Sequence, residues 1–367
     1  MTTRSFVEQQ LCRLHHRRYS HLVGNGTAGI ALSLEAMGVK NKSVAVPDSV
    51  CLNVPLSVIF SGNQPEYLDI DRSHYGLSLD ELEDRLPSLG AIVAVHGYGH
   101  ISPVDKIEAL GEKAGIPVIE DACLVQGGDL SGRPTGSFGS ASVVSFGAGK
   151  PIALGDGGAV LTDDFALYQE VKRLDSKLPS ATEGSKTAIE ALGREHTRLY
   201  NEHFGRDLQA NAENFRKKAF LSKAFFHHRF DESLLPELCS ALDTLPAAVA
   251  LRWSNWRKLS DALHSALGDA VRIMIPAPGS VPWRLNLCVN HRDELLQALH
   301  QKKINASSWH PCASSFLDAE RSICQHEMSE YVASNILNLW ISGEDFEQYL
   351  HVVPETVKEI ILGLEKN

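Results

Sequence analysis

Three polar side chains in the first half of the chain, Asp121, Ser145 and Lys150, have the types and the spacing to do chemistry together. Asp121 ends one apolar run, and Ser145 lies near the end of the next. Lys150 follows among small residues, before the turn Gly155-Asp-Gly-Gly158. Each residue alone is more often structural, as a helix cap, a strand serine or a solvated amine. Neighbouring parallel strands would bring all three to one edge of a sheet, where they could act on one ligand.

A glycine-rich segment upstream, Gly24-Asn-Gly26-Thr27-Ala-Gly29, could bind a phosphate, because it opens a helical pattern and exposed amides at a helix N-terminus bind anions. Its spacing, with Asp48 downstream, also matches a dinucleotide-binding motif, so a nicotinamide-dependent oxidoreductase is an alternative. The run His21-Leu-Val23 is short for the strand that such a motif requires, and Asp48 follows a proline. We therefore interpret the segment as a phosphate anchor.

A lysine, a carboxylate, a hydroxyl and a phosphate anchor are the groups that pyridoxal 5'-phosphate (PLP) requires. Lys150 could bind the aldehyde of this cofactor and move protons, and Asp121 could keep its pyridine nitrogen protonated. Gly26, Thr27 and Ser145 could bind its phosphate. This combination predicts a PLP site more strongly than any one of its members.

The pattern of apolar runs predicts an α/β fold with a mostly parallel sheet, helices on both faces and ligands at the carboxyl ends of the strands. At roughly 150 residues per domain, 367 residues suit one large and one smaller domain. We predict a large domain over 1–250, with a helical insertion near 175–220, and a small α+β C-terminal domain over 251–367. Predicted strands span 43–47, 66–71, 91–96, 117–121, 141–146, 158–162 and 281–289, and predicted helices span 28–37, 78–86, 104–114, 164–173, 186–201, 237–265, 292–301 and 354–366.

Nine motifs together resemble a known family. They are Asn25-Gly-Thr27, Val46-Pro47, Tyr67–Asp71, Val95–His100, Ile119–Ala122, Gly136–Gly139, Ser145-Phe146, Lys150 and Gly155–Gly158. Residues 20–165 are thereby similar to the DegT–DnrJ–StrS family of PLP-dependent sugar aminotransferases, which have the PLP-dependent transferase fold type I. The resemblance implies that Lys150 is the Schiff-base lysine, that Asp121 is the partner of the pyridine nitrogen, and that Gly26, Thr27 and Ser145 contact the phosphate.

Three positions depart from the family pattern. Cys51 stands where the family has an aromatic residue stacked on the cofactor ring, and Leu124 stands where it has a glutamine. His227 aligns with an asparagine that reaches the phosphate bound by the neighbouring subunit, so His227 is a candidate phosphate contact in trans. The alternative is that the pair His227-His228 lies on an ordinary surface helix.

The resemblance implies transfer of an amino group from glutamate or glutamine to a nucleotide-linked keto sugar or to a related polyol. It also implies that the enzyme is a homodimer with shared active sites. Arg229, Arg252 and Arg257 are candidates for a basic patch that would bind an anionic acceptor. The changes beside the ring leave open a PLP-dependent lyase, decarboxylase or oxidase that acts on an amino acid. A PLP-binding regulator without turnover is an alternative of another class.

The composition restricts the partners and the cellular location. Lys and Arg total 35 against 45 Asp and Glu, a net charge of −10 with a pI of about 5.9, which argues against nucleic acid. Apolar runs fall short of the ~18 residues of a membrane span and the polar N-terminus lacks a signal-peptide core, so we expect a cytoplasmic protein.

Seven cysteines without Cys-x-x-Cys spacing predict no disulfide framework. His96 and His100 have metal-ligand spacing, but the glycines between them disfavour a helix, so we predict no metal site.

Overall fold

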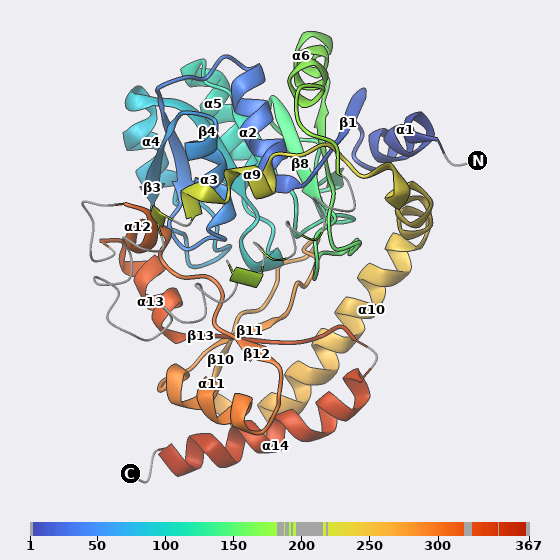
Figure 1. The fold of residues 1–367 in the computed structure, drawn as a ribbon. Helices are drawn as coiled ribbons and strands as arrows, with labels where there is room; N and C mark the ends of the chain where they lie inside the picture. Colours follow the sequence, from blue (N-terminus) through green and yellow to red (C-terminus); the bar gives the residue numbers. More distant parts are fainter. Residues whose placement is uncertain are drawn as a thin grey trace.

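The computed structural model describes residues 3–181, 187, 191, 194–195, 216–217, 219–318, 325–343 and 345–364. A large α/β unit and a smaller α+β unit are joined by one long helix (Figure 1). The predicted helix over 186–201 and most of the predicted insertion near 175–220 lie outside the described residues.

A seven-stranded sheet forms the centre of the large unit, in the order β1-β9-β8-β5-β4-β2-β3. The strands are β1 (Tyr19–Val23), β2 (Ser43–Pro47), β3 (Gln64–Leu68), β4 (Leu89–Val95), β5 (Val118–Asp121), β8 (Ala141–Ser145) and β9 (Gly158–Thr162). Five of them, from β8 to β3, run parallel, while β9 pairs antiparallel with both β8 and β1. The predicted mostly parallel α/β sheet is therefore confirmed.

Helices cover both faces of this sheet because alternate strand residues on each side are apolar. Val44 and Val46 of β2 join the core beneath α2, α3 and α6, whereas Ala45 faces the core formed with α4 and α5. The helices of the large unit are α1 (Arg4–Leu14), α2 (Gly26–Ala36), α3 (Asn53–Phe60), α4 (Leu79–Arg85), α5 (Val104–Ala114), α6 (Phe165–Asp175) and α9 (Lys223–Phe226). Short elements are β6 (Asp129–Leu130), β7 (Arg133–Pro134) and the 3-10 turns Leu86–Ser88, Gly97–Gly99, Glu232–Leu234 and Gly268–Ala270.

The long helix α10 (Leu235–Leu267) passes from one hydrophobic core to the other. Leu238 and Leu245 pack with the large unit, and Trp256 and Leu259 pack with the small one, so the change of core falls between Leu245 and Trp256. By length and composition alone, the segment Glu232–Leu267 could cross a membrane, which the sequence-based expectation overlooked. A single such helix is weak evidence for a membrane span, because core helices of soluble proteins pass the same test.

The small unit is a four-stranded antiparallel sheet covered by helices (Figure 1). Its strands are β10 (Arg272–Ile273), β11 (Leu285–Cys288), β12 (Ala306–Ser307) and β13 (Ile336–Leu339), and its helices are α11 (Arg292–Gln301), α12 (Ala313–Leu317), α13 (Glu327–Asn335) and α14 (Phe346–Leu364). The prediction that the last helix begins at Pro354 is wrong, because Pro354 lies inside α14. Buried Phe346, Val353 and Val357 offset the cost of an interior proline, about 3 kcal/mol.

Candidate active site

A cavity of about 570 Å³ lies at the carboxyl ends of the parallel strands, and the small unit supplies part of its wall. Strands β5 and β8 are adjacent and parallel, so the residues that follow their carboxyl ends meet at this cavity. Seven of the eight predicted site residues line this cavity: Gly26, Thr27, Cys51, Asp121, Leu124, Ser145 and Lys150. The small unit adds Trp283, Arg284, Trp309 and His310.

Lys150 lies on the loop between β8 and β9, and its backbone is held from two sides. Its amide donates to the carbonyl of Gly147 at 3.3 Å. The buried guanidinium of Arg252 donates to the carbonyls of Lys150 (2.9 Å) and Gly149 (3.4 Å), and also to that of Trp283 (3.1 Å). Arg252 is thus a positioning residue for the lysine loop, and the prediction that it belongs to a substrate-binding patch is wrong.

Replacing Arg252 with methionine is expected to slow the reaction of Lys150 with PLP by about 10- to 100-fold, because the loop loses its two carbonyl contacts with Arg252 and small misplacements are costly. The rate of cofactor binding, followed by absorbance, measures this. Arg257→Met on the same helix is the control, since Arg257 is exposed. An unchanged rate in Arg252→Met would contradict the positioning role.

Asp121 presents a carboxylate whose contacts within the described residues are with Cys123. It is 7% exposed, and Oδ1 accepts a hydrogen bond from the amide of Cys123 at 3.0 Å. Since this side chain lines the cavity, its second oxygen can accept from a protonated ring nitrogen. The donor set and the cavity therefore fit the cofactor that the sequence predicts.

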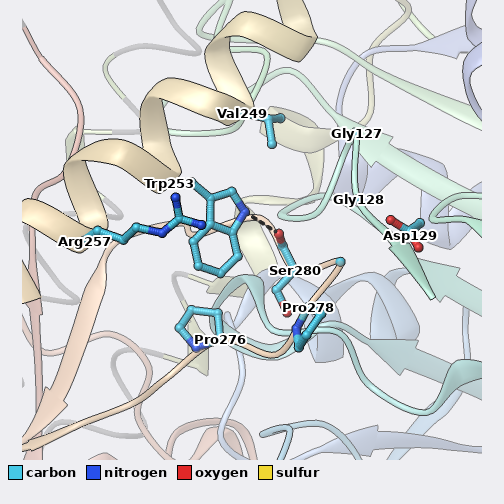
Figure 2. Close-up of a pocket in the computed structure, with 10 residues that line it drawn as sticks. Gly127, Gly128, Asp129, Val249, Trp253, Arg257, Pro276, Pro278 and Ser280 are labelled. Atoms are coloured by element: carbon cyan, nitrogen blue, oxygen red, sulfur yellow. Dashed lines mark hydrogen bonds between the residues drawn. The ribbon is translucent and has the colours of Figure 1, made fainter. Parts of the chain in front are cut away.

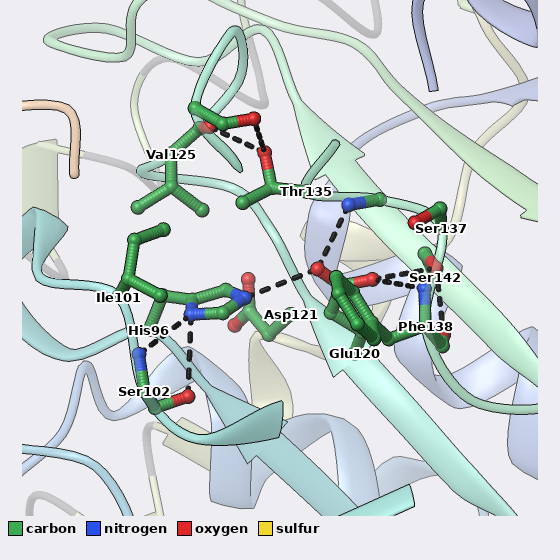
Figure 3. Close-up of polar contacts among 12 residues, drawn as sticks. His96, Ile101, Ser102, Glu120, Asp121, Val125, Thr135, Ser137, Phe138 and Ser142 are labelled. Atoms are coloured by element: carbon green, nitrogen blue, oxygen red, sulfur yellow. Dashed lines mark hydrogen bonds and ion pairs between the residues drawn. The ribbon is translucent and has the colours of Figure 1, made fainter. Parts of the chain in front are cut away.

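Glu120, the neighbour of Asp121, points to the opposite face of β5 and anchors the strand end (Figure 3). Its fully buried carboxylate accepts from His96 Nε2 (3.1 Å), from the amides of Gly136 and Phe138 (2.8 Å each) and from Ser142 Oγ (3.0 Å). Burial raises the pKa of Glu120, but the contacts with His96 and with the two amides outweigh it and hold the pKa below the ordinary 4.5.

Replacing Glu120 with glutamine is expected to lower the free energy of unfolding by about 2–4 kcal/mol at pH 7, because an amide NH₂ would face buried donors. Ionised Glu120 stabilises the fold above pH 4.5, and this contribution is lost as the pH falls through the lower pKa of the folded state. Urea unfolding of wild type and Glu120→Gln should therefore converge below pH 4.5. Glu112→Gln, on an exposed position, is the control. A difference that stays constant down to pH 3 would contradict this.

The end of the cavity beside the N-terminus of α2 offers donors for a phosphate. Asn25 caps α2 by accepting from the amide of Ala28 at 2.9 Å, which places Gly26 and Thr27 at the helix N-terminus beside Ser145. A Cβ on Gly26 would lie 3.0 Å from Cys123 Sγ and 3.1 Å from Ser145 Cβ, so glycine keeps this approach open.

His228, rather than His227, lines the cavity at this end. Its Nε2 lies 3.4 Å from Asn25 Nδ2 and 3.4 Å from Asp156 Oδ2. His227 Nδ1 contacts the carbonyl of Lys223 at 3.1 Å, within its own helix α9. The structure therefore does not bring His227 into the cavity of its own chain, and its contact in trans stays a prediction.

Two thiols, Cys51 and Cys123, lie near Lys150 and Asp121. Burial raises the pKa of both, although the charge of Lys150 opposes the shift. Both thiols are therefore protonated at neutral pH and are poor nucleophiles. Lys150 supplies an amine to the cavity wall, and Cys51 and Leu124 contribute apolar surface to it.

A second hollow, of about 440 Å³, lies elsewhere, against α10 (Figure 2). Trp253 Nε1 donates to the carbonyl of Ser280 at 3.0 Å, and Arg257 stacks on the Trp253 ring. Arg257 therefore lies outside the candidate active site, and the side chain of Arg229 binds the hydroxyl of Ser180. The basic patch predicted from these arginines is wrong, and the arginine in the cavity wall is Arg284, which no sequence motif indicated.

The dinucleotide interpretation of the glycine-rich segment is also wrong. Strand β1 lies at the sheet edge and pairs antiparallel with β9, whereas that motif requires a parallel βαβ unit. Asp48 is fully buried and accepts from the amide and hydroxyl of Ser314, both at 2.7 Å. It is therefore structural and unavailable to a ribose.

Known structures share this arrangement. An aminotransferase of the DegT DnrJ EryC1 StrS group from Brucella abortus superposes with a TM-score of 0.75 at 20% identity, over 97% of this chain and 89% of that one. S. venezuelae DesV gives 0.75 at 21%, over 97% and 88%. Helicobacter pylori PseC, an aminotransferase involved in the biosynthesis of pseudoaminic acid, gives 0.76 at 16%, over 97% and 91%. The fold is thus that of PLP-dependent aminotransferases, fold type I.

The model of the DegT/DnrJ/EryC1/StrS aminotransferase family matches residues 2–344. The chain belongs to this family of PLP-dependent aminotransferases, as its motifs between residues 20 and 165 predicted.

Proposed function

We propose that the protein transfers an amino group from glutamate or glutamine to an acceptor, with PLP bound at Lys150. The acceptor is a keto group on a nucleotide-linked sugar or on a related polyol. The observation that carries this proposal is the meeting of Lys150, Asp121 and the N-terminus of α2 around one cavity. Solved relatives support the substrate class, since DesI, at 21% identity, was determined in the presence of its TDP-sugar product.

When bound, PLP supplies an aldehyde that carries the amino group and a ring that accepts electrons. Lys150 Nζ would hold the cofactor, take the proton from the α-carbon of the donor and return it to the cofactor carbon that is bonded to the same nitrogen. Asp121 would keep the ring nitrogen protonated through its carboxylate, and Gly26, Thr27 and Ser145 would bind the phosphate. Trp283 and Trp309 line the cavity and would exclude water.

Three finer points belong to the same proposal. The protein acts as a homodimer, with His227 reaching the phosphate in the partner's site, and it is cytoplasmic. Family membership supports the dimer with shared sites. The cysteine pattern, which predicts no disulfide framework, supports the location.

Transfer of ¹⁵N from labelled L-glutamate tests the reaction type. We expect one equivalent of ¹⁵N in the protein-bound cofactor after the glutamate product is removed, and its delivery to a keto sugar added second. A lyase or decarboxylase would instead release ammonia or carbon dioxide, and a regulator without turnover would leave the label on glutamate. Either result would contradict the proposal.

A further inference from the structure

Four segments that are far apart in the sequence meet at the end of the cavity beside the N-terminus of α2. Asn25 caps α2, and the turn that follows the lysine loop packs against this cap, since the amide of Gly157 donates to the carbonyl of Gly24 at 2.8 Å. Strand β8 brings Ser145 to the same end, and the segment after α9 brings His228. A phosphate bound at the amides of α2 would therefore have His228 as a neighbour.

The position of His228 is fixed by several contacts. The residue is 3% exposed, and its Nδ1 lies 3.0 Å from the carbonyl of Arg229, which can only accept, so Nδ1 carries a proton. A Cβ on Gly24 would lie 2.8 Å from the same nitrogen, so glycine at this position permits the close approach. Asn25 Nδ2 donates to the carbonyl of Phe226 at 3.0 Å and ties this segment to the start of α2. Nε2 is therefore the ring nitrogen that remains for a ligand.

A carboxylate lies beside this nitrogen. His228 Nε2 is 3.4 Å from Asp156 Oδ2, and Asp156 also lines the cavity with a side chain that is 39% exposed. A phosphate at this end would meet a group of like charge, which weakens binding. The described lining residues of this end come from 25–27, 145–148, 155–156 and 225–228, and among them His228 is the side chain that can carry a positive charge.

We propose that His228, as a cation, binds the phosphate of PLP within its own subunit and separates that phosphate from Asp156; this rests on the proposed function. Nδ1 already donates to the chain, so the second proton is added at Nε2, beside Asp156. An imidazole flanked by two anions is favoured in its protonated form, and its hydrogen bonds to them are charge-assisted. The contact is made in cis, so it is additional to the contact in trans proposed for His227.

Binding of 4-deoxypyridoxine 5'-phosphate to the full chain freed of PLP tests this inference. The analogue lacks the aldehyde, so its Kd, measured by calorimetry, does not depend on the reaction with Lys150. 4-Deoxypyridoxine lacks the phosphate as well. We expect His228→Gln to weaken binding of the phosphorylated analogue about 10- to 100-fold at pH 7, and binding of 4-deoxypyridoxine less than about 2-fold. A purely structural role of His228 would weaken both alike.

Asp156→Asn tests the separation of the two negative charges. With the carboxylate removed, His228 no longer offsets a repulsion between Asp156 and the phosphate. The loss of affinity caused by His228→Gln should therefore be smaller in the Asp156→Asn background than in wild type. The two single variants and the double variant, each measured with both analogues, complete this comparison.

His264→Gln, at an exposed position of α10, is the matched control and should leave both Kd values unchanged. Circular dichroism spectra should be the same in all variants. Equal effects of His228→Gln on the two analogues, or an equal loss with and without Asp156, would overturn the inference while PLP still binds to Lys150. Failure of wild type to bind PLP at Lys150 would instead overturn the proposed function.

Discussion

Replacing Lys150 with alanine is expected to lower kcat by at least about 10⁴-fold, because one amine both holds the cofactor and moves the proton. The loss should appear in the half-reaction with glutamate, measured by single-turnover absorbance. The free energy of unfolding should change by less than about 0.5 kcal/mol, because Lys150 is only partly buried and its side chain makes no hydrogen bond within the described residues.

Two controls separate chemistry from folding in this experiment. Lys106→Ala removes an exposed lysine of α5 and should keep full activity. Methylamine added to Lys150→Ala should restore part of the rate by supplying a free amine. Full activity of Lys150→Ala without added amine would remove Lys150 from the mechanism.

Replacing Asp121 with asparagine is expected to lower the rate of the same half-reaction by about 10²–10³-fold. Asparagine has the same size and can still accept from the amide of Cys123, so the change isolates the negative charge. Without that charge the ring nitrogen is less often protonated and accepts electrons less well.

Asp105→Asn, at an exposed position of α5, is the control for removing one negative charge from this acidic protein. Cofactor occupancy should be confirmed for each variant before the rates are compared. An unchanged rate in fully loaded Asp121→Asn would place the partner of the ring nitrogen elsewhere.

The predicted site residues that line the cavity share one property: each follows an apolar strand of the central sheet. Asp121 and Ser145 end β5 and β8, and Gly26 opens the helix after β1, so local patterns place them at one edge. The family motifs are concentrated in the same region, which is why seven of eight predicted site residues line the cavity.

The residues that the sequence analysis missed come from long-range contacts. Arg252 reaches Lys150 across 102 positions, and Arg284 enters the cavity from the residue just before strand β11 of the small unit, with no motif around it. His228 lines the cavity of its own chain without any motif to indicate it, whereas the contact of His227 in trans stays a prediction. Proline is favoured at the first position of a helix, yet Pro354 lies inside α14 because tertiary packing outweighs that preference.

The most direct test of the central claim is the site at which borohydride fixes PLP to the protein. The account predicts loss of the visible absorption band and one reduced cofactor per chain, found by peptide mass spectrometry on Lys150. Attachment at another lysine, or none after saturation with PLP, would contradict it.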